Sequence, residues 1–325
     1  MPTEVEISAV VCTLGHDLSL LKRVVESLAR QSMPAERFEV LVVVNGPDPA
    51  AVRGVTRLLG DYRDAIPNLS LVHEPRLGVS HARSLGLSAA RAEIVAYLDD
   101  DGVAEPDWLE THRNTYRRCP AVAALGGRVD LEWPTGRPSW LVPDLEVFYS
   151  RYDLGPDAQV VIGNGRSPYP IGTNMSFRKS EVPGRFSARL GHRSGSLISN
   201  EEDEMCRRLQ ATGGTIVYEP DAVVHHVIRS ERVCRRWLVR RTFAQGRSDV
   251  ISAHISGAGK TNRVYWLGRA GRAVLSAVGR GKGALIRDAW RGDGSRAFVV
   301  EAARVSRVLG RAREGLALAL VGRGN

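Results

Sequence analysis

The sequence predicts an α/β protein built on a mostly parallel sheet with flanking helices. Short apolar runs alternate with segments of helical spacing over the first hundred residues, and the last run ends directly in Asp99, Asp100 and Asp101. Strands that are buried on both faces read as continuous apolar runs, and their alternation with helices is typical of a parallel sheet. In such sheets ligands bind beyond the carboxyl ends of the strands, where these three acids are expected to lie.

Each element of this first half is predicted from its own pattern. Strands are expected where a short apolar run ends in polar or turn residues, and helices where apolar residues recur every three to four positions. The expected strands are 6–12, 39–44, 69–73 and 94–98, and the expected helices are 18–30, 50–62 and 79–91. The chain therefore alternates strand and helix up to the aspartates.

After Asp107 the pattern changes. Prolines and glycines recur between 133 and 172, which is typical of loops that shape a binding site. A helix is expected at 200–209, followed by strands at 215–218 and 222–227. The helix begins with four adjacent acids, Glu201, Glu202, Asp203 and Glu204. Capping and the helix dipole need fewer acids than this, and crowded like charges raise the pKa of some members, which suits a general base.

The three aspartates are candidate ligands for a divalent cation. Clustered carboxylates repel one another unless a positive charge lies between them, and Mg²⁺-type ions use a few carboxylates together with phosphate oxygens. His225 and His226 follow a strand, and because side chains alternate along a strand only one of them can face the same site. A site with oxygen and nitrogen ligands favours Mn²⁺ or Mg²⁺. The alternative is an acidic, solvated turn before a helix that begins near Pro106.

Charge divides the chain into two regions. Residues 229–325 hold 21 Lys and Arg against 6 Asp and Glu, whereas residues 1–228 hold 24 against 30. We therefore expect a catalytic domain at 1–228 and a basic helical region at 229–325. Basic amphipathic helices are typical of binding to membrane surfaces or anionic partners, and the alternative is that they pack on the catalytic domain. No nucleic-acid reader motif is present, so nucleic acid is not an expected partner.

The bulk composition favours a cytoplasmic protein. No apolar stretch approaches the roughly 20 residues needed to span a bilayer, and the N-terminus lacks the pattern of a signal peptide. The four cysteines are far apart and form no metal-ligand spacing, which fits a reducing compartment. If the basic helices bind lipid, the expected place is the inner membrane surface.

Several stretches in order resemble family 2 glycosyltransferases of the GT-A fold. The matching stretches are 10–13, Gly78 with Ala82 and Arg83, the DxD run 97–101, the segment 172–178, the acidic helix 201–209 and the strand 220–226. The resemblance covers residues 5–250 and implies a Rossmann-like sheet. It implies transfer of a sugar from a nucleotide-diphosphate donor to an acceptor hydroxyl with inversion. It also implies a nucleotide-sugar-binding half at 1–105 and an acceptor and catalytic half at 106–228.

The resemblance implies roles for single residues. Glu202 matches the family's general base, and Glu201 and Asp203 are neighbours that could substitute for it. The metal ligands implied for Mn²⁺ or Mg²⁺ are Asp99, Asp101 and His226. The residues expected to bind the nucleotide-sugar donor are Thr13, Asn45, Arg83, Asp99 and Asp100.

Departures from the family pattern bear on the substrates. Val44 stands where the family usually carries a carboxylate at the end of its second strand. We expect a UDP-sugar donor, with GDP- and dTDP-sugars as alternatives, and a glycan, lipid-linked or small-molecule acceptor. One competing function is a sugar nucleotidyltransferase, which would need a basic, Gly-rich phosphate loop where Leu14-Gly15-His16-Asp17 stands. Another is a non-catalytic protein that docks on membranes or acidic partners through the basic region.

Overall fold

The structure is a computed structural model that describes residues 4–164, 168–193, 195–257 and 296–321. The chain divides into two compact units, one of 1–132, 150–188 and 201–227 and one of 133–149, 189–200 and 228–325. Two internal segments of the catalytic domain expected at 1–228 thus belong to the second unit. The helical character expected for 258–295 concerns residues outside the described ranges.

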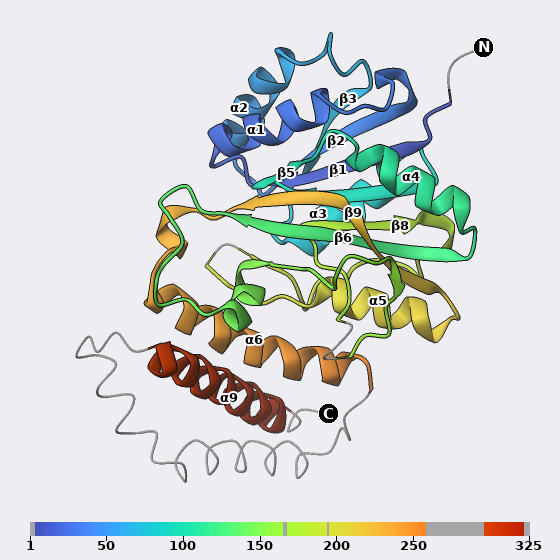
Figure 1. Ribbon diagram of the computed structural model, residues 1–325. Helices are drawn as coiled ribbons and strands as arrows, with labels where there is room; N and C mark the ends of the chain where they lie inside the picture. Colours follow the sequence, from blue (N-terminus) through green and yellow to red (C-terminus); the bar gives the residue numbers. More distant parts are fainter. Residues whose placement is uncertain (1–3, 165–167, 194, 258–295, 322–325) are drawn as a thin grey trace. The chain divides into compact units, whose positions relative to one another are not determined.

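The first unit is built on a nine-stranded sheet in the order β3-β2-β1-β4-β8-β6-β9-β5, with β7 paired to β9 (Figure 1). The strands are β1 (Ile7–Thr13), β2 (Phe38–Asn45), β3 (Leu69–Glu74), β4 (Ile94–Asp99), β5 (Gly102–Ala104), β6 (Val122–Glu132), β7 (Gln159–Val160), β8 (Asn174–Arg178) and β9 (Thr215–Val227). Strands β1 to β4 are parallel, whereas β8 runs antiparallel to both β4 and β6. The predicted mostly parallel α/β sheet is confirmed.

Alternation along the strands builds one core on each face of the sheet. Val40 and Val42 lie in the core that α1 (Leu18–Ala29), α2 (Pro49–Gly60) and α4 (Trp108–Arg118) cover. Leu41 and Val43 point the other way, into the core that α3 (Val79–Ala89) and α5 (Glu201–Ala211) cover. Each such fully buried side chain contributes about 1.5–3 kcal/mol. This two-sided burial explains why the strands read as continuous apolar runs.

Residues 215–218 and 222–227 form one strand, β9, rather than the two strands expected. Its register against β6 shifts between Gly127 and Arg128, so residues 220–222 have no partner on β6. A bulge of this kind bends a strand and re-aims the side chains that follow it. The bulge therefore sets the direction in which His225 and His226 point.

Asn174 joins four elements of the first unit. Its side-chain nitrogen donates hydrogen bonds to the carbonyls of Arg128 (2.9 Å) and Ala222 (2.8 Å), and its oxygen accepts one from the indole of Trp108 (2.8 Å). The residue is fully buried, and an amide in that setting needs these partners. Asn174 thus fixes β8 against β6, β9 and α4 and holds the preceding Thr173 in place.

The second unit contains the long helices α6 (Arg235–Ile255) and α9 (Arg296–Val321), which run side by side (Figure 1). A Cβ atom on Gly246 or Gly310 would lie 1.9 or 2.0 Å from a carbonyl oxygen of the other helix, so only glycine permits this approach. Asp249 of α6 accepts hydrogen bonds from Arg307 (2.9 Å) and Arg311 (2.6 Å) of α9. Two arginines of the predicted basic helix are therefore engaged within the helix pair. None of the described helices is both long and apolar enough to span a bilayer.

Candidate active site

The predicted site residues of the N-terminal half gather where three parallel strands end. Strands β1, β2 and β4 are adjacent, and they end at Thr13, Asn45 and Asp99. Asp100 and Asp101 follow β4 directly. The carboxyl edge of a parallel sheet is the usual ligand site in such folds, so the topology places these side chains at the expected edge.

Thr13 and Asp100 contact each other directly. The Thr13 hydroxyl donates a hydrogen bond to Oδ2 of Asp100 at 2.7 Å and accepts one from the backbone N–H of Gly15 at 2.9 Å. Gly15 has a φ of +70°, a conformation that favours glycine. The turn after β1 therefore folds back onto the threonine, and this pair holds the beginning of the acidic run against β1.

Asn45 makes its hydrogen bonds within the protein. Its nitrogen donates to the carbonyls of Glu74 (3.2 Å) and Arg76 (2.7 Å), and its oxygen accepts from the N–H of Gly78 (2.8 Å). Gly78 has a φ of +134° and directly precedes α3. Asn45 thus shapes the loop between β3 and α3, on the side of the sheet edge expected to hold the nucleotide.

Arg83 joins residues that lie far apart in the sequence. Its guanidinium donates hydrogen bonds to Oε1 of Glu201 and, at 3.1 Å, to Oδ1 of Asp99. The other oxygen of Asp99 accepts the hydroxyl of Thr173 at 2.8 Å. The Arg83 guanidinium thus links the end of β4 to the beginning of α5. The structure brings the two predicted carboxylate clusters together at this side chain.

Asp101 and His226 form a buried pair. Oδ1 of Asp101 lies 3.2 Å from Nε2 of His226, and both residues are at most 4% exposed. Backbone pairing fixes their approach, because Gly102 faces His226 in the β5–β9 ladder and Val227 N–H donates to the Asp101 carbonyl at 2.8 Å. Ligands at right angles on one cation, with bonds of about 2.1 Å, lie about 3 Å apart. The pair has the spacing of two metal ligands.

The three-residue ligand set implied by the sequence is not preassembled. Among the residues that the structure describes, no group of three or more His, Cys, Asp or Glu side chains is arranged to hold a metal ion. Asp99 contacts Arg83 and Thr173, whereas Asp101 contacts His226. A cation at the Asp101–His226 pair would therefore need further ligands from substrate or water, as Mg²⁺-type sites commonly do.

The four acids of α5 have different environments. Glu201 is 2% exposed and contacts Arg83; burial raises the pKa of its carboxyl well above the usual range, and Glu202 raises it further. Glu204 is paired with Arg208 at 2.8 Å, and Asp203 lies 3.6 Å from Arg207. Glu202 is partly exposed, and its Oε2 is buried without a hydrogen-bond partner. Glu201 also has an oxygen without a partner, but Glu201 is buried and paired with Arg83, whereas Glu202 is partly exposed.

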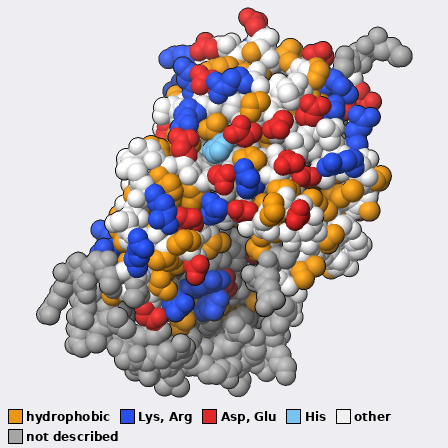
Figure 2. All heavy atoms as spheres, viewed as in Figure 1, with side chains coloured by type: hydrophobic (Ala, Val, Ile, Leu, Met, Phe, Trp, Pro, Cys, Tyr) orange, Lys and Arg blue, Asp and Glu red, His pale blue; other side chains and the backbone are white. Residues whose placement is uncertain are grey.

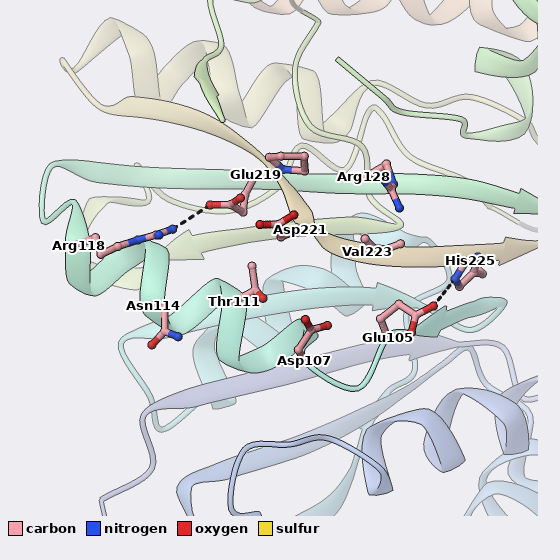
Figure 3. A pocket seen from close by; sticks show the side chains of 11 residues that line it. Glu105, Asp107, Thr111, Asn114, Arg118, Arg128, Glu219, Asp221, Val223 and His225 are labelled. Carbon is pink, nitrogen blue, oxygen red and sulfur yellow. Dashed lines mark hydrogen bonds and ion pairs between the residues drawn. The ribbon is translucent and has the colours of Figure 1, made fainter. Parts of the chain in front are cut away.

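A cavity of about 490 Å³ lies beside the bulge of β9 (Figure 3). Its lining includes Glu105, Arg128, Glu219, Asp221 and His225, and none of the predicted site residues is part of it. His225 contacts Glu105 at 2.6 Å on this side, because consecutive side chains of β9 point in opposite directions. Acidic and basic side chains are interspersed over the face of the molecule that Figure 2 shows. His225 and His226 thus face different sites.

The sequence interpretation missed two residues that organise the site. Thr173 orients Asp99, and Asn174 holds the strand that carries it. Both lie in the segment 172–178, which was matched to the family without a role for either side chain. The signal was a run of small and polar residues, Gly172-Thr173-Asn174, beside apolar strand residues, where buried polar groups need specific partners.

The fold is that of the GT-A glycosyltransferases. S. aureus TarS residues 1–349, solved in complex with UDP-GlcNAc, matches with a TM-score of 0.53 and 16% identity over 77% of this chain and 73% of that chain. GalNAc-T7, solved with UDP, GalNAc and Mn²⁺, matches with a TM-score of 0.53 and 15% identity over 76% of this chain and 50% of that chain. At such identities the likeness concerns the fold.

The chain belongs to glycosyltransferase family 2. The sequence model of that family, Glycosyl transferase family 2, matches residues 8–182. The glucosyl-dolichyl phosphate glucuronosyltransferase of Haloferax volcanii is 30% identical over 255 residues, which is 76% of this chain and 77% of that protein. The succinoglycan biosynthesis protein ExoM of Rhizobium meliloti is 28% identical over 252 residues, 76% of this chain and 75% of that protein. The family places the chain with glycosyltransferases rather than with sugar nucleotidyltransferases.

Proposed function

We propose that the chain transfers a sugar from a nucleotide-diphosphate donor to an acceptor hydroxyl, with inversion at the anomeric carbon. The observation that carries this proposal is the guanidinium of Arg83, which joins Asp99 to Glu201. Asp99 belongs to the carboxylate cluster beside the leaving diphosphate, and Glu201 directly precedes the proposed base, Glu202. One site then supplies what a single displacement needs, stabilisation of the charge on the leaving group and a proton acceptor.

Glu202 acts as the general base in this mechanism. The acceptor oxygen attacks the anomeric carbon from the face opposite the diphosphate. The bond from that carbon to the diphosphate oxygen breaks with its electron pair on the diphosphate, and the acceptor proton passes to Glu202. The unpartnered, buried Oε2 of Glu202 supports this role. Because one displacement occurs, the configuration inverts.

We propose that Asp101 and His226 hold the divalent cation, Mn²⁺ or Mg²⁺. Their separation of 3.2 Å fits two ligands of one ion. Both oxygens of Asp99 are engaged by Arg83 and Thr173, so Asp99 would act chiefly by its charge and orientation. When bound, the cation stabilises the negative charge that develops on the leaving diphosphate.

The donor and acceptor are proposed from the chemistry of similar proteins. UDP-GlcNAc in TarS and UDP in GalNAc-T7 support a UDP-sugar donor. Val44 offers no carboxylate to a uracil ring, so GDP- and dTDP-sugars are the alternatives. The name of the Haloferax relative supports a lipid-linked acceptor, with other glycans and small molecules as further candidates.

A panel of UDP-, GDP- and dTDP-sugars with Mn²⁺ tests the proposed function. We expect one nucleotide class, at about 100 times its Kd, to raise the melting temperature by roughly 5 °C. The same donor is expected to release free nucleotide slowly without acceptor, and faster once an acceptor is present. The proposal fails if no nucleotide sugar stabilises the protein and none is consumed, which is the behaviour expected of a non-catalytic docking protein.

We also propose that the second unit binds an anionic membrane surface. Leu309, Leu316 and Leu320 of α9 are 40%, 42% and 62% exposed, and the spacing of seven and four residues places them on one side of the helix. Arg313 lies on the same side with 55% of its side chain exposed. Leucines beside a cation are typical of helices that lie in a lipid interface. The cytoplasmic location, at the inner membrane surface, stays a prediction.

Vesicle binding is expected to depend on these leucines. The protein should co-sediment with vesicles that contain phosphatidylglycerol, and the Leu316→Ser/Leu320→Ser variant should bind about tenfold more weakly because less apolar surface enters the lipid. Raised salt should weaken binding. The control is Val160→Ser/Ile162→Ser. These two apolar side chains belong to the first unit and are 59% and 61% exposed. Equal losses in the two variants would contradict the proposed lipid contact.

A further inference from the structure

We infer that Arg83 is a positioning residue that sets the geometry between the leaving group and the general base, an inference that rests on the proposed function. The resemblance implied a different role, in which Arg83 lines the donor site. The guanidinium is instead enclosed by two carboxylates from opposite sides of the proposed reaction, Asp99 and Glu201. It therefore acts on the transfer through those carboxylates rather than by touching the sugar nucleotide.

The burial of Arg83 supports this role. The residue is 4% exposed, and Glu201 and Asp99 are 3% and 31% exposed at their side chains. A guanidinium keeps its charge in proteins and offers a planar fork of donors, so it can hold two carboxylates in one plane. A buried cation needs such partners, since removing one side of a buried ion pair leaves the other charge uncompensated.

The surroundings leave the guanidinium little freedom. A Cβ atom on Gly172 would lie 1.9 Å from Nη2 of Arg83, so a side chain at position 172 would force the guanidinium to shift. The Tyr97 hydroxyl donates to the Arg83 carbonyl at 2.9 Å, and Thr173 donates to the Asp99 oxygen that Arg83 does not use. Strand β4, helix α3, helix α5 and the segment before β8 thus meet at this one side chain.

Loss of the guanidinium has a specific chemical consequence. Glu201 and Asp99 would lose the guanidinium that joins them, and a buried carboxylate without its ion-pair partner is destabilised. The first turn of α5 carries both Glu201 and Glu202, so a shift of Glu201 away from its present position also moves the proposed base. Displacements of about 1 Å cost up to a hundredfold in rate. Donor binding, which depends on the strand ends, should change much less than kcat.

Helix α5 offers a matched control. Arg208 also braces α5, through Glu204 at 2.8 Å and through the carbonyls of Pro183 and Arg185. It contacts neither Asp99 nor Glu201 in the described structure. If Arg83 mattered only because it stabilises α5, Arg208→Met would reproduce its kinetic effect.

The test compares Arg83→Met, Arg83→Lys, Gly172→Ala and Arg208→Met with the wild-type chain by steady-state transfer kinetics. We expect Arg83→Met to lower kcat about a hundredfold while the donor KM stays within about threefold. Arg83→Lys should recover part of kcat, because the charge remains and the fork is lost. Gly172→Ala should lower kcat with every charge in place. Arg208→Met should keep kcat within about threefold even if it lowers the melting temperature.

The outcomes separate this inference from the proposed function. If the wild-type chain transfers no sugar from any donor, the proposed function fails. If the wild-type chain is active and Arg83→Met keeps its kcat, or Arg208→Met loses as much, the positioning role alone is overturned. Should Arg83→Met not fold, Arg83→Lys and Gly172→Ala decide the question, and an unchanged kcat in both overturns the inference.

Discussion

Replacing Glu202 with Gln is expected to lower kcat for sugar transfer by about a thousandfold without unfolding the chain. The substitution keeps the size of the side chain but removes the proton acceptor, and general base catalysis contributes about 10²–10⁴-fold. Glu202 is partly exposed and its Oε2 has no hydrogen-bond partner, so little stability depends on it. Steady-state rates with donor and acceptor, together with melting temperatures, measure both quantities.

The neighbouring acids provide the controls for this prediction. Asp203→Asn should keep kcat within about threefold, because the Asp203 carboxylate lies 3.6 Å from the Arg207 guanidinium and is not the proposed base. Glu201→Gln should lower kcat through the loss of the contact with Arg83, an effect that Arg83→Met is expected to share. Glu202→Gln, in contrast, removes the proposed base and leaves the contact between Arg83 and Glu201 in place. A full thousandfold loss in Asp203→Asn, with Glu202→Gln active, would assign the base to Asp203.

The parallel half of the fold could be predicted because its strands are buried on both faces. Helices cover each side of β1, β2 and β4, so almost every position is apolar and the runs stand out in the sequence. These strands also end in polar residues of the predicted site, Thr13, Asn45 and Asp99. Local pattern and tertiary environment agree there, and the observed elements lie within two residues of the expected ones.

Strands β6 and β8 could not be predicted because tertiary contacts determine them. Strand β6 carries Gly126 and Gly127 in its middle, which read as a break. A Cβ atom on Gly127 would lie 2.1 Å from the carbonyl of Ala222, so glycine marks close approach of the β9 bulge instead. Strand β8 buries Asn174 and Ser176, whose partners come from distant segments. No local pattern identifies such partners.

For the candidate site, motif order predicts the residues but not their individual environments. The runs Asp99–Asp101 and Glu201–Glu204 read as uniform clusters in the sequence. In the structure neighbouring members of a run have different contacts: Asp99 contacts Arg83, whereas Asp101 contacts His226. The contacts of each side chain depend on alternation along a strand and on rotation around a helix. Both change the direction of the side chain from one residue to the next. A shift of one residue in either element would exchange the roles.

Removal of divalent cations is expected to abolish transfer, and Asp101→Asn is expected to lower kcat by at least a hundredfold at saturating Mn²⁺. Asp101 and His226 lie 3.2 Å apart, a distance that fits two ligands of one cation, and an amide at Asp101 loses the charge that the cation needs. His226→Gln should mainly raise the Mn²⁺ concentration needed for half-maximal rate. Titration of the EDTA-treated protein with Mn²⁺ measures both effects.

Strand β9 supplies the control, since the adjacent His225 forms a similar pair with Glu105 at 2.6 Å on the opposite face. Glu105→Gln should leave both kcat and the Mn²⁺ requirement within about twofold of the wild-type values. The two substitutions remove the same charge from carboxylate–histidine pairs that differ by one position along the strand. If metal dependence followed Glu105 rather than Asp101, the cation would belong to the cavity beside the bulge, and the assignment of His226 to the transfer site would be wrong.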